Sequence, residues 1–115
     1  MSRASNVAAR KVASAALVFA ALGDETRLAL VSRLAAEGPR SIAELSAGAS
    51  VTRQAITKHL RALAFAGLAH DTRRGRESIW ELTPRRLESA RSYLDDVSAH
   101  WDLALGRLQG FVEEP

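Results

Sequence analysis

Residues 41–67, with the sequence SIAELSAGASVTRQAITKHLRALAFAG, decide the fold of this 115-residue chain. Ser41 and Glu44 have the spacing of a capping box, in which a serine hydroxyl and a glutamate carboxylate each accept a hydrogen bond from a free N–H group at the start of a helix. A short helix is therefore expected to begin at residue 42, with Ile42 and Leu45 facing the interior.

A second, longer helix follows a tight connection that contains Gly48. Thr52 is a good N-cap for this helix and Gly67 favours its end, so we expect the helix to extend to about Ala66. Two helices joined by a few residues that include a glycine are typical of a helix-turn-helix, which here would span residues 41–66.

The longer helix has two chemically different faces. Its apolar face comprises Ile56, Leu60, Leu63 and Gly67, and its polar face comprises Arg53, Gln54, Thr57, Lys58 and Arg61. An α-helix fits the major groove of B-DNA, where Arg or Lys can donate to guanine and Gln can pair with adenine. The polar face is therefore a candidate DNA-binding surface. Taken without the rest of the sequence, the same residues are also typical of a solvated amphipathic helix.

Residues 68–82 have the pattern of a β-hairpin. Two short strands, 68–72 and 78–82, flank the turn Arg73-Arg74-Gly75-Arg76, in which Gly75 is expected to adopt a positive φ. The three arginines would place positive charge against a phosphate backbone. A capped helix, a turn, a basic helix and a cationic hairpin, in this order, predict a winged helix-turn-helix, a mainly α fold of about five helices with a two-stranded wing.

Two helices are expected to precede this motif. The first spans residues 7–22 and ends at Gly23, and Asp24 caps the second. Apolar residues at three-residue spacing indicate the face of the second helix that packs on the core. The side chains expected to be buried there are Leu28, Val31 and Leu34.

A last helix is expected over residues 84–111, because Thr83 is a good N-cap and Pro84 is preferred at the first helical position. Apolar residues recur in it every seven positions for four heptads, a pattern that one helix presents to another in a long, shallow crossing. One series is Leu87, Leu94, Trp101 and Leu108, and the other is Ala90, Val97, Ala104 and Phe111. Because this stripe is longer than a core of this size can cover, it predicts a homodimer.

Composition excludes several classes of function. The chain has no cysteine, so disulfides, thiolate metal sites and cysteine nucleophiles are excluded. The formal net charge is +3. Residues 1–76 carry 12 Lys/Arg and 5 Asp/Glu, whereas residues 77–115 carry 4 and 8, so the positive field is confined to the first two-thirds of the chain. No phosphate-binding loop, dinucleotide fingerprint or nucleophile elbow is present, so we expect neither an enzyme nor a cofactor.

The N-terminal segment has two interpretations. An uncharged run, residues 12–23, follows three cationic residues, as in a signal peptide. Helical spacing of Val12, Ala15 and Phe19 within the run favours a helix of the folded protein instead. The run is also shorter than the roughly 20 apolar residues of a membrane span, so we expect a cytoplasmic protein with no membrane partner.

Potential metal ligands are sparse. On the last helix Asp96 and His100 stand at i and i+4, but no second histidine accompanies them, so ordinary polar pairing is expected there rather than a metal site. His59 is adjacent to the core residue Leu60 and is expected to pack or to contact a phosphate. His70 lies in a strand with no carboxylate or histidine at ligand spacing.

Residues 17–84 resemble the winged-helix repressors of the ArsR family. The similar segments are FAALGDETRLALVSRLA (19–35), SIAELS (41–46), SVTRQAITKHLRALAFAGLA (50–69) and RRGRESIWELTP (73–84). The stretch YLDDVSAHWDLALGRL (93–108) is similar to a subgroup with a long C-terminal helix and no cysteine metal site. Glu25 stands where the family often has proline, and both residues suit the first turn of a helix.

The resemblance implies a homodimeric repressor that binds double-stranded DNA at a palindromic operator and responds to an inducer that the sequence does not identify. The residues expected to contact DNA are Thr52, Arg53, Gln54, Thr57, Lys58, His59, Arg61, Arg73, Arg74 and Arg76. The first and last helices would form the dimer, with Val12, Phe19, Leu87, Leu94, Val97, Trp101, Leu108 and Phe111 at its interface. Residues 1–115 are expected to form a single winged helix-turn-helix domain. An alternative function is a winged-helix adapter whose basic face binds an acidic protein.

Overall fold

The computed structural model describes the backbone of residues 3–113 and the side chains of residues 6–110. The elements in chain order are α1 (Arg3–Leu22), α2 (Glu25–Glu37), β1 (Arg40–Ser41), α3 (Ile42–Ser46), α4 (Arg53–Phe65), β2 (Ala69–Arg74), β3 (Glu77–Leu82) and α5 (Pro84–Glu113). This order confirms the predicted winged helix-turn-helix of five helices and a wing hairpin.

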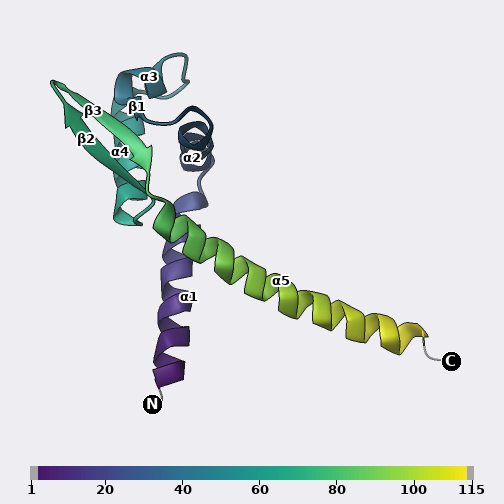
Figure 1. Cartoon of the computed structure of the whole chain (residues 1–115). Helices are drawn as coiled ribbons and strands as arrows, with labels where there is room; N and C mark the ends of the chain where they lie inside the picture. The colour runs from purple at the N-terminus through teal and green to yellow at the C-terminus, as the bar shows by residue number, and fades with distance from the viewer. Residues whose placement is uncertain (1–2, 114–115) are drawn as a thin grey trace.

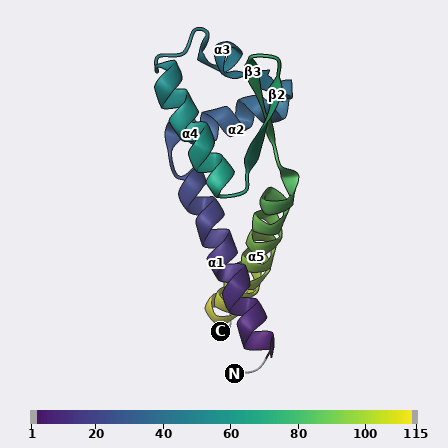
Figure 2. The ribbon, with the colours of Figure 1, turned by 90° about the vertical axis from the view of Figure 1, so that its left-hand side faces the viewer.

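Two helices extend away from the winged core. Figure 1 shows α2, α3, α4 and the sheet gathered together, while α1 and α5 leave this core from one end and diverge. In Figure 2 the two helices run down together from the core. The radius of gyration is 19.0 Å, against about 13 Å expected for a compact domain of this length. Much of α1 and α5 therefore has no core of its own chain to cover it.

The sheet has three antiparallel strands in the order β1-β3-β2. The wing turn consists of Gly75 and Arg76 alone, since Arg74 pairs with Glu77, and Gly75 has the predicted positive φ, +60°. The predicted strand 68–72 differs from β2 at both ends: β2 begins at Ala69, and Arg73 and Arg74 belong to it rather than to the turn. The strand β1 was not predicted, since its two residues owe their conformation to pairing with β3.

The core lies where the last turns of α1 and the helices α2, α3 and α4 meet the sheet. Its most enclosed side chains are Val18, Leu45, Ile56, Leu60, Leu63 and Leu68. The prediction for α2 was wrong in one residue, because Leu28 is 50% exposed and Leu30 is buried instead. Leu28 and Leu30 lie about 200° apart around the helix, so both cannot face the core, and Leu30 shares its face with Leu34.

Within residues 3–113 no single helix is both long and apolar enough to cross a membrane. Segments Asn6–Leu22 and Glu25–Glu37 together reach that length and composition, but they are bent by 97° at the break between them.

Candidate DNA-binding surface

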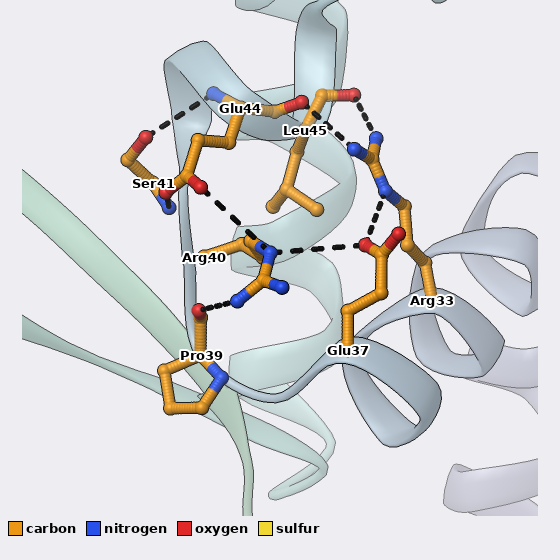
Figure 3. A network of polar contacts seen from close by, with 7 residues as sticks. All are labelled: Arg33, Glu37, Pro39, Arg40, Ser41, Glu44 and Leu45. Carbon is orange, nitrogen blue, oxygen red and sulfur yellow. Dashed lines mark hydrogen bonds and ion pairs between the residues drawn. The ribbon is translucent and has the colours of Figure 1, made fainter.

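The short helix α3 is held in place by a guanidinium group of α2, drawn in Figure 3. Arg33 donates to the carbonyl oxygens of Leu45 and Glu44, each over 3.1 Å, and its Nε donates to the Glu37 carboxylate over 2.7 Å. These carbonyl groups belong to the last turn of α3, where no N–H group of the helix itself can donate to them. Arg33 therefore acts as a C-terminal cap supplied from a neighbouring helix.

The start of α3 confirms the predicted capping box. The Ser41 N–H donates to Glu44 Oε1 over 3.0 Å, and the Glu44 N–H donates to Ser41 Oγ over 3.1 Å. The hydrogen bond from the Ser41 backbone lowers the pKa of Glu44, helped by the Ser41 hydroxyl and by the charges of Arg40 and Arg33. Arg40 Nε also lies 3.7 Å from Glu44 and 3.8 Å from Glu37, which links both ends of the α2–α3 connection (Figure 3).

Helix α4 presents its predicted polar face to solvent. Thr52 caps it, because its hydroxyl accepts from the Ala55 N–H over 3.1 Å. The Thr57 hydroxyl donates its proton to the Arg53 carbonyl over 2.8 Å. The groups of Thr57 that are left for other contacts are its methyl group and the lone pairs of its oxygen. Thr57 is half-buried, and the exposed members of the face are Arg53, Gln54, Lys58 and Arg61.

His59 stands at the edge of this face and has a partner that the sequence did not indicate. Its Nδ1 lies 3.8 Å from Asp24 Oδ2, and the imidazole side chain is 23% exposed. The Asp24 carboxylate accepts from the Arg27 N–H over 3.0 Å, and this bond, with the charges of Arg27 and His59, lowers the pKa of Asp24. The contact joins α4 to the N-terminus of α2.

The wing lies across a groove from α4. All three of its arginines, Arg73, Arg74 and Arg76, are exposed. The groove has a volume of about 490 Å³, and the residues that α4 and the wing contribute to it are Arg53, Gln54, Thr57, Arg76, Glu77 and Ser78. The structure thus brings the polar face of α4 and the cationic end of the wing to the same side of the molecule.

His70 has a carboxylate within reach that its place in the sequence did not indicate. His70 pairs with Glu81 across the sheet, and its Nε2 lies 2.9 Å from Glu81 Oε1. Its Nδ1 lies 2.6 Å from Thr83 Oγ1, so the imidazole joins the base of the wing to the start of α5. Cross-strand neighbours eleven residues apart have no local sequence signal.

On α5 the predicted Asp96 and His100 do not bring their side chains together. His100 Nδ1 lies 2.8 Å from the Asp96 carbonyl oxygen, and the Asp96 carboxylate instead lies 3.6 Å from Lys11 Nζ. Among the described residues, no three His, Asp or Glu side chains are grouped so that they could hold a metal ion.

The residues expected at a dimer interface fall into two groups. Phe19 and Leu87 pack partly against the core of their own chain, and the Phe19 ring lies 6.3 Å from that of Tyr93. The exposed group comprises Val12, Leu94, Val97, Trp101 and Leu108, of which Trp101 is 63% exposed. The side chain of Phe111 lies outside the described residues. Exposed Leu105 extends the same face and was missed.

Three comparisons identify the family. Residues 22–72 match the model of a helix-turn-helix domain family. The chain is 40% identical over 85 residues to the HTH-type transcriptional regulator Rv2034 of Mycobacterium tuberculosis, covering 74% of this chain and 76% of that protein. It is 35% identical, with a TM-score of 0.75, to the structure of an ArsR-like transcriptional regulator from Rhodococcus sp. RHA1, over 90% of this chain and 97% of that one.

A third relative is similar in fold alone. The structure of Mb0332 from Mycobacterium bovis, described as a homodimeric winged helix-turn-helix DNA-binding domain and a possible ArsR-family regulator, is 24% identical to this chain. It superposes with a TM-score of 0.62 over 90% of this chain and 91% of that one. The matched relatives are transcriptional regulators rather than enzymes, and this chain belongs to the ArsR family of helix-turn-helix transcriptional regulators.

Proposed function

We propose that this protein is a homodimeric repressor that binds double-stranded DNA in a sequence-specific manner. The observation that supports this proposal best is the groove shared by the exposed polar face of α4 and the cationic wing. A helix in the major groove and an adjacent basic hairpin can contact one DNA duplex at the same time, since both lie on one side of the molecule.

In this proposal α4 reads base edges. Arg53 and Lys58 are exposed and can donate to guanine O6 and N7, and Gln54 can form a bidentate pair with adenine. Thr57, whose hydroxyl proton is engaged by the Arg53 carbonyl, offers a methyl group that suits the methyl group of thymine. These four residues lie in the first half of α4, the end that a recognition helix directs at the bases.

The remaining polar residues would bind the phosphate backbone. The three wing arginines are exposed on strands or at the turn and are free to approach phosphates beside the major groove. At the edges of α4, the residues placed to contact phosphates are Thr52, His59 and Arg61. Such contacts provide affinity and orientation but little sequence discrimination.

A second copy of the chain would cover the exposed apolar stripe of α5 together with α1. Trp101 and Leu94 belong to an exposed apolar surface of a kind that monomeric proteins rarely leave uncovered, and the fold relative from M. bovis is described as a homodimer. In a twofold-symmetric dimer with its two α4 helices about 34 Å apart, each helix would read one half of a palindromic operator. Function on DNA also places the protein in the cytoplasm.

The test is direct measurement of DNA binding by fluorescence anisotropy. The specific duplex comes from the region upstream of the protein's own gene, and the control duplex has the same composition in scrambled order. We expect binding to the specific duplex to be at least 10³-fold tighter at physiological salt. Arg85→Ala, at an exposed arginine of α5 away from the groove, is the control variant. Equal affinity for the two duplexes would refute sequence-specific binding at that region.

A further inference from the structure

A second polar cavity lies between α1 and α5, outside the DNA-binding surface. Its volume is about 330 Å³. Its floor is formed by the small side chains of Ala15 and Ala90, both buried. The polar residues around it are Lys11 and Ser14 from α1 and Arg86, Glu88, Ser89 and Ser92 from α5.

These side chains provide more donors than the protein uses. Among the described residues, the guanidinium of Arg86 makes one hydrogen bond, from Nη1 to Ser14 Oγ over 3.0 Å. The Lys11 ammonium has only a loose ion pair with Asp96, at 3.6 Å between side chains that are both more than half exposed. Glu88 also lines the cavity, and its carboxylate lies 3.9 Å from Arg91 Nη1, which offsets its charge. The Ser89 hydroxyl donates to the Arg85 carbonyl over 3.1 Å. Two cations beside the hydroxyl groups of Ser14 and Ser92 suit a small oxyanion.

Two serines that line the cavity lie away from the exposed residues of the apolar stripe, although Ala90 belongs to both the stripe and the cavity. Ser89 precedes Leu94 by five residues and Ser92 precedes Val97 by five, which corresponds to about 140° around an α-helix. A second chain that covers Leu94 and Val97 would therefore leave these serines accessible.

Arg86 connects this cavity to the end of the recognition helix. Its side chain lies over Gly67, the residue that follows the C-cap of α4 and has a φ of +77°. A Cβ atom at position 67 would be 2.9 Å from Arg86 Cγ and 3.3 Å from its Nε. The stem of Arg86 thus fills the space beside α4, while its guanidinium reaches Ser14 on α1.

We infer that the cavity between α1 and α5 binds a small ligand with an oxyanion group, a carboxylate or a phosphate, between Lys11 and Arg86. An anion that draws the Arg86 guanidinium away from Ser14 shifts the stem that packs on Gly67, so occupancy is communicated to α4. This regulatory part rests on the DNA-binding function proposed above, whereas ligand binding itself does not.

Isothermal titration calorimetry on the full chain tests the binding, with sodium phosphate and sodium acetate as separate probes at constant ionic strength. We expect saturable binding of at least one probe, weakened about tenfold or more in Lys11→Gln and in Arg86→Gln. The control Arg85→Gln removes the same charge one residue away, outside the cavity, and should bind like the unmodified protein. No saturable binding of either probe, or an equal loss in Arg85→Gln, would overturn the inference.

DNA affinity, measured with and without the bound probe, tests the regulatory part. The ratio of the two affinities should differ from one in the unmodified protein and return to one in Arg86→Gln. Circular dichroism confirms that each variant is folded. If the ratio is one although the probe binds, the connection through Gly67 is refuted; if no DNA binds at all, the proposed function fails while the calorimetric result stands.

Discussion

Replacing two exposed residues of the α5 stripe, Leu94→Glu together with Trp101→Glu, should convert the protein into a folded monomer. Trp101 is 63% exposed in the single chain. A tryptophan buries roughly 150–250 Å², so covering the exposed part removes roughly 95–160 Å² from water and contributes about 2–4 kcal/mol per chain at 25 cal/mol per Å². Both chains lose this contribution, and Leu94, which is 50% exposed, adds to the loss.

The dimer should therefore be weakened by about 5 kcal/mol or more, which corresponds to over 10³-fold in the dissociation constant. Sedimentation equilibrium at micromolar concentration measures the change, and circular dichroism verifies that the helices persist. Leu103→Glu is a matched control, because Leu103 is also 63% exposed but lies about 200° from Trp101 around the helix. A double variant that stays dimeric, or a Leu103 variant that dissociates equally, would refute the reasoning.

Two further predictions concern the DNA-binding surface, and a third concerns the capping box of α3. Arg53→Ala and Lys58→Ala should each weaken binding to the preferred operator by about 1–3 kcal/mol, measured by an anisotropy titration, and should reduce discrimination between operators. An equal loss of affinity for random DNA would assign both residues to phosphates instead. Neutralising Arg73, Arg74 and Arg76 together should lower the slope of log affinity against log salt by about 2.7, since each lost phosphate contact accounts for about 0.9, and an unchanged slope would place the wing outside the interface. Hydrogen bonding lowers the pKa of Glu44, so the ionised carboxylate stabilises the folded state. This stabilisation is fully present above pH 4.5, the ordinary pKa, and is lost as the pH falls through the lowered pKa. The melting temperature of Glu44→Gln should therefore vary less in this acidic range than that of the unmodified protein, and parallel profiles would contradict this origin.

Features that depend on neighbours in the sequence could be predicted from the sequence. The capping box of Ser41 and Glu44, the N-caps Asp24 and Thr52, and the positive φ of Gly75 each require residue types at fixed short spacings. The buried face of α4 was also predicted, because charged residues on one side leave little doubt about which side is apolar.

Features that depend on contacts between distant segments could not be predicted. The strand β1 exists because Arg40 and Ser41 pair with residues some forty positions later. Arg33 caps α3 from another helix, and no local pattern distinguishes it from an ordinary surface arginine. Leu28 was misplaced because α2 contains three leucines among alanines. A buried face with residues three apart and one with residues four apart, such as Leu30 and Leu34, fit the sequence equally well.

The candidate site shows the same division between local and distant signals. The polar residues of α4 were identified from their helical spacing, but the partner of His59 on α2 was not. The cavity between α1 and α5 had no sequence signal either, since Lys11 and Arg86 come from opposite ends of the chain.

Because α5 is long, a small change in its angle moves its far end by a large distance. Its 30 residues extend about 45 Å, so a tilt of roughly 5° where it leaves the wing displaces the far end by about 4 Å. In a homodimer joined along these helices, the far ends are fixed to each other, and the displacement appears instead in the separation of the two DNA-reading cores. A shift of this size exceeds the 3.4 Å rise of one base pair. Two α4 helices could thus lose their register on the duplex while the fold of each core stays the same.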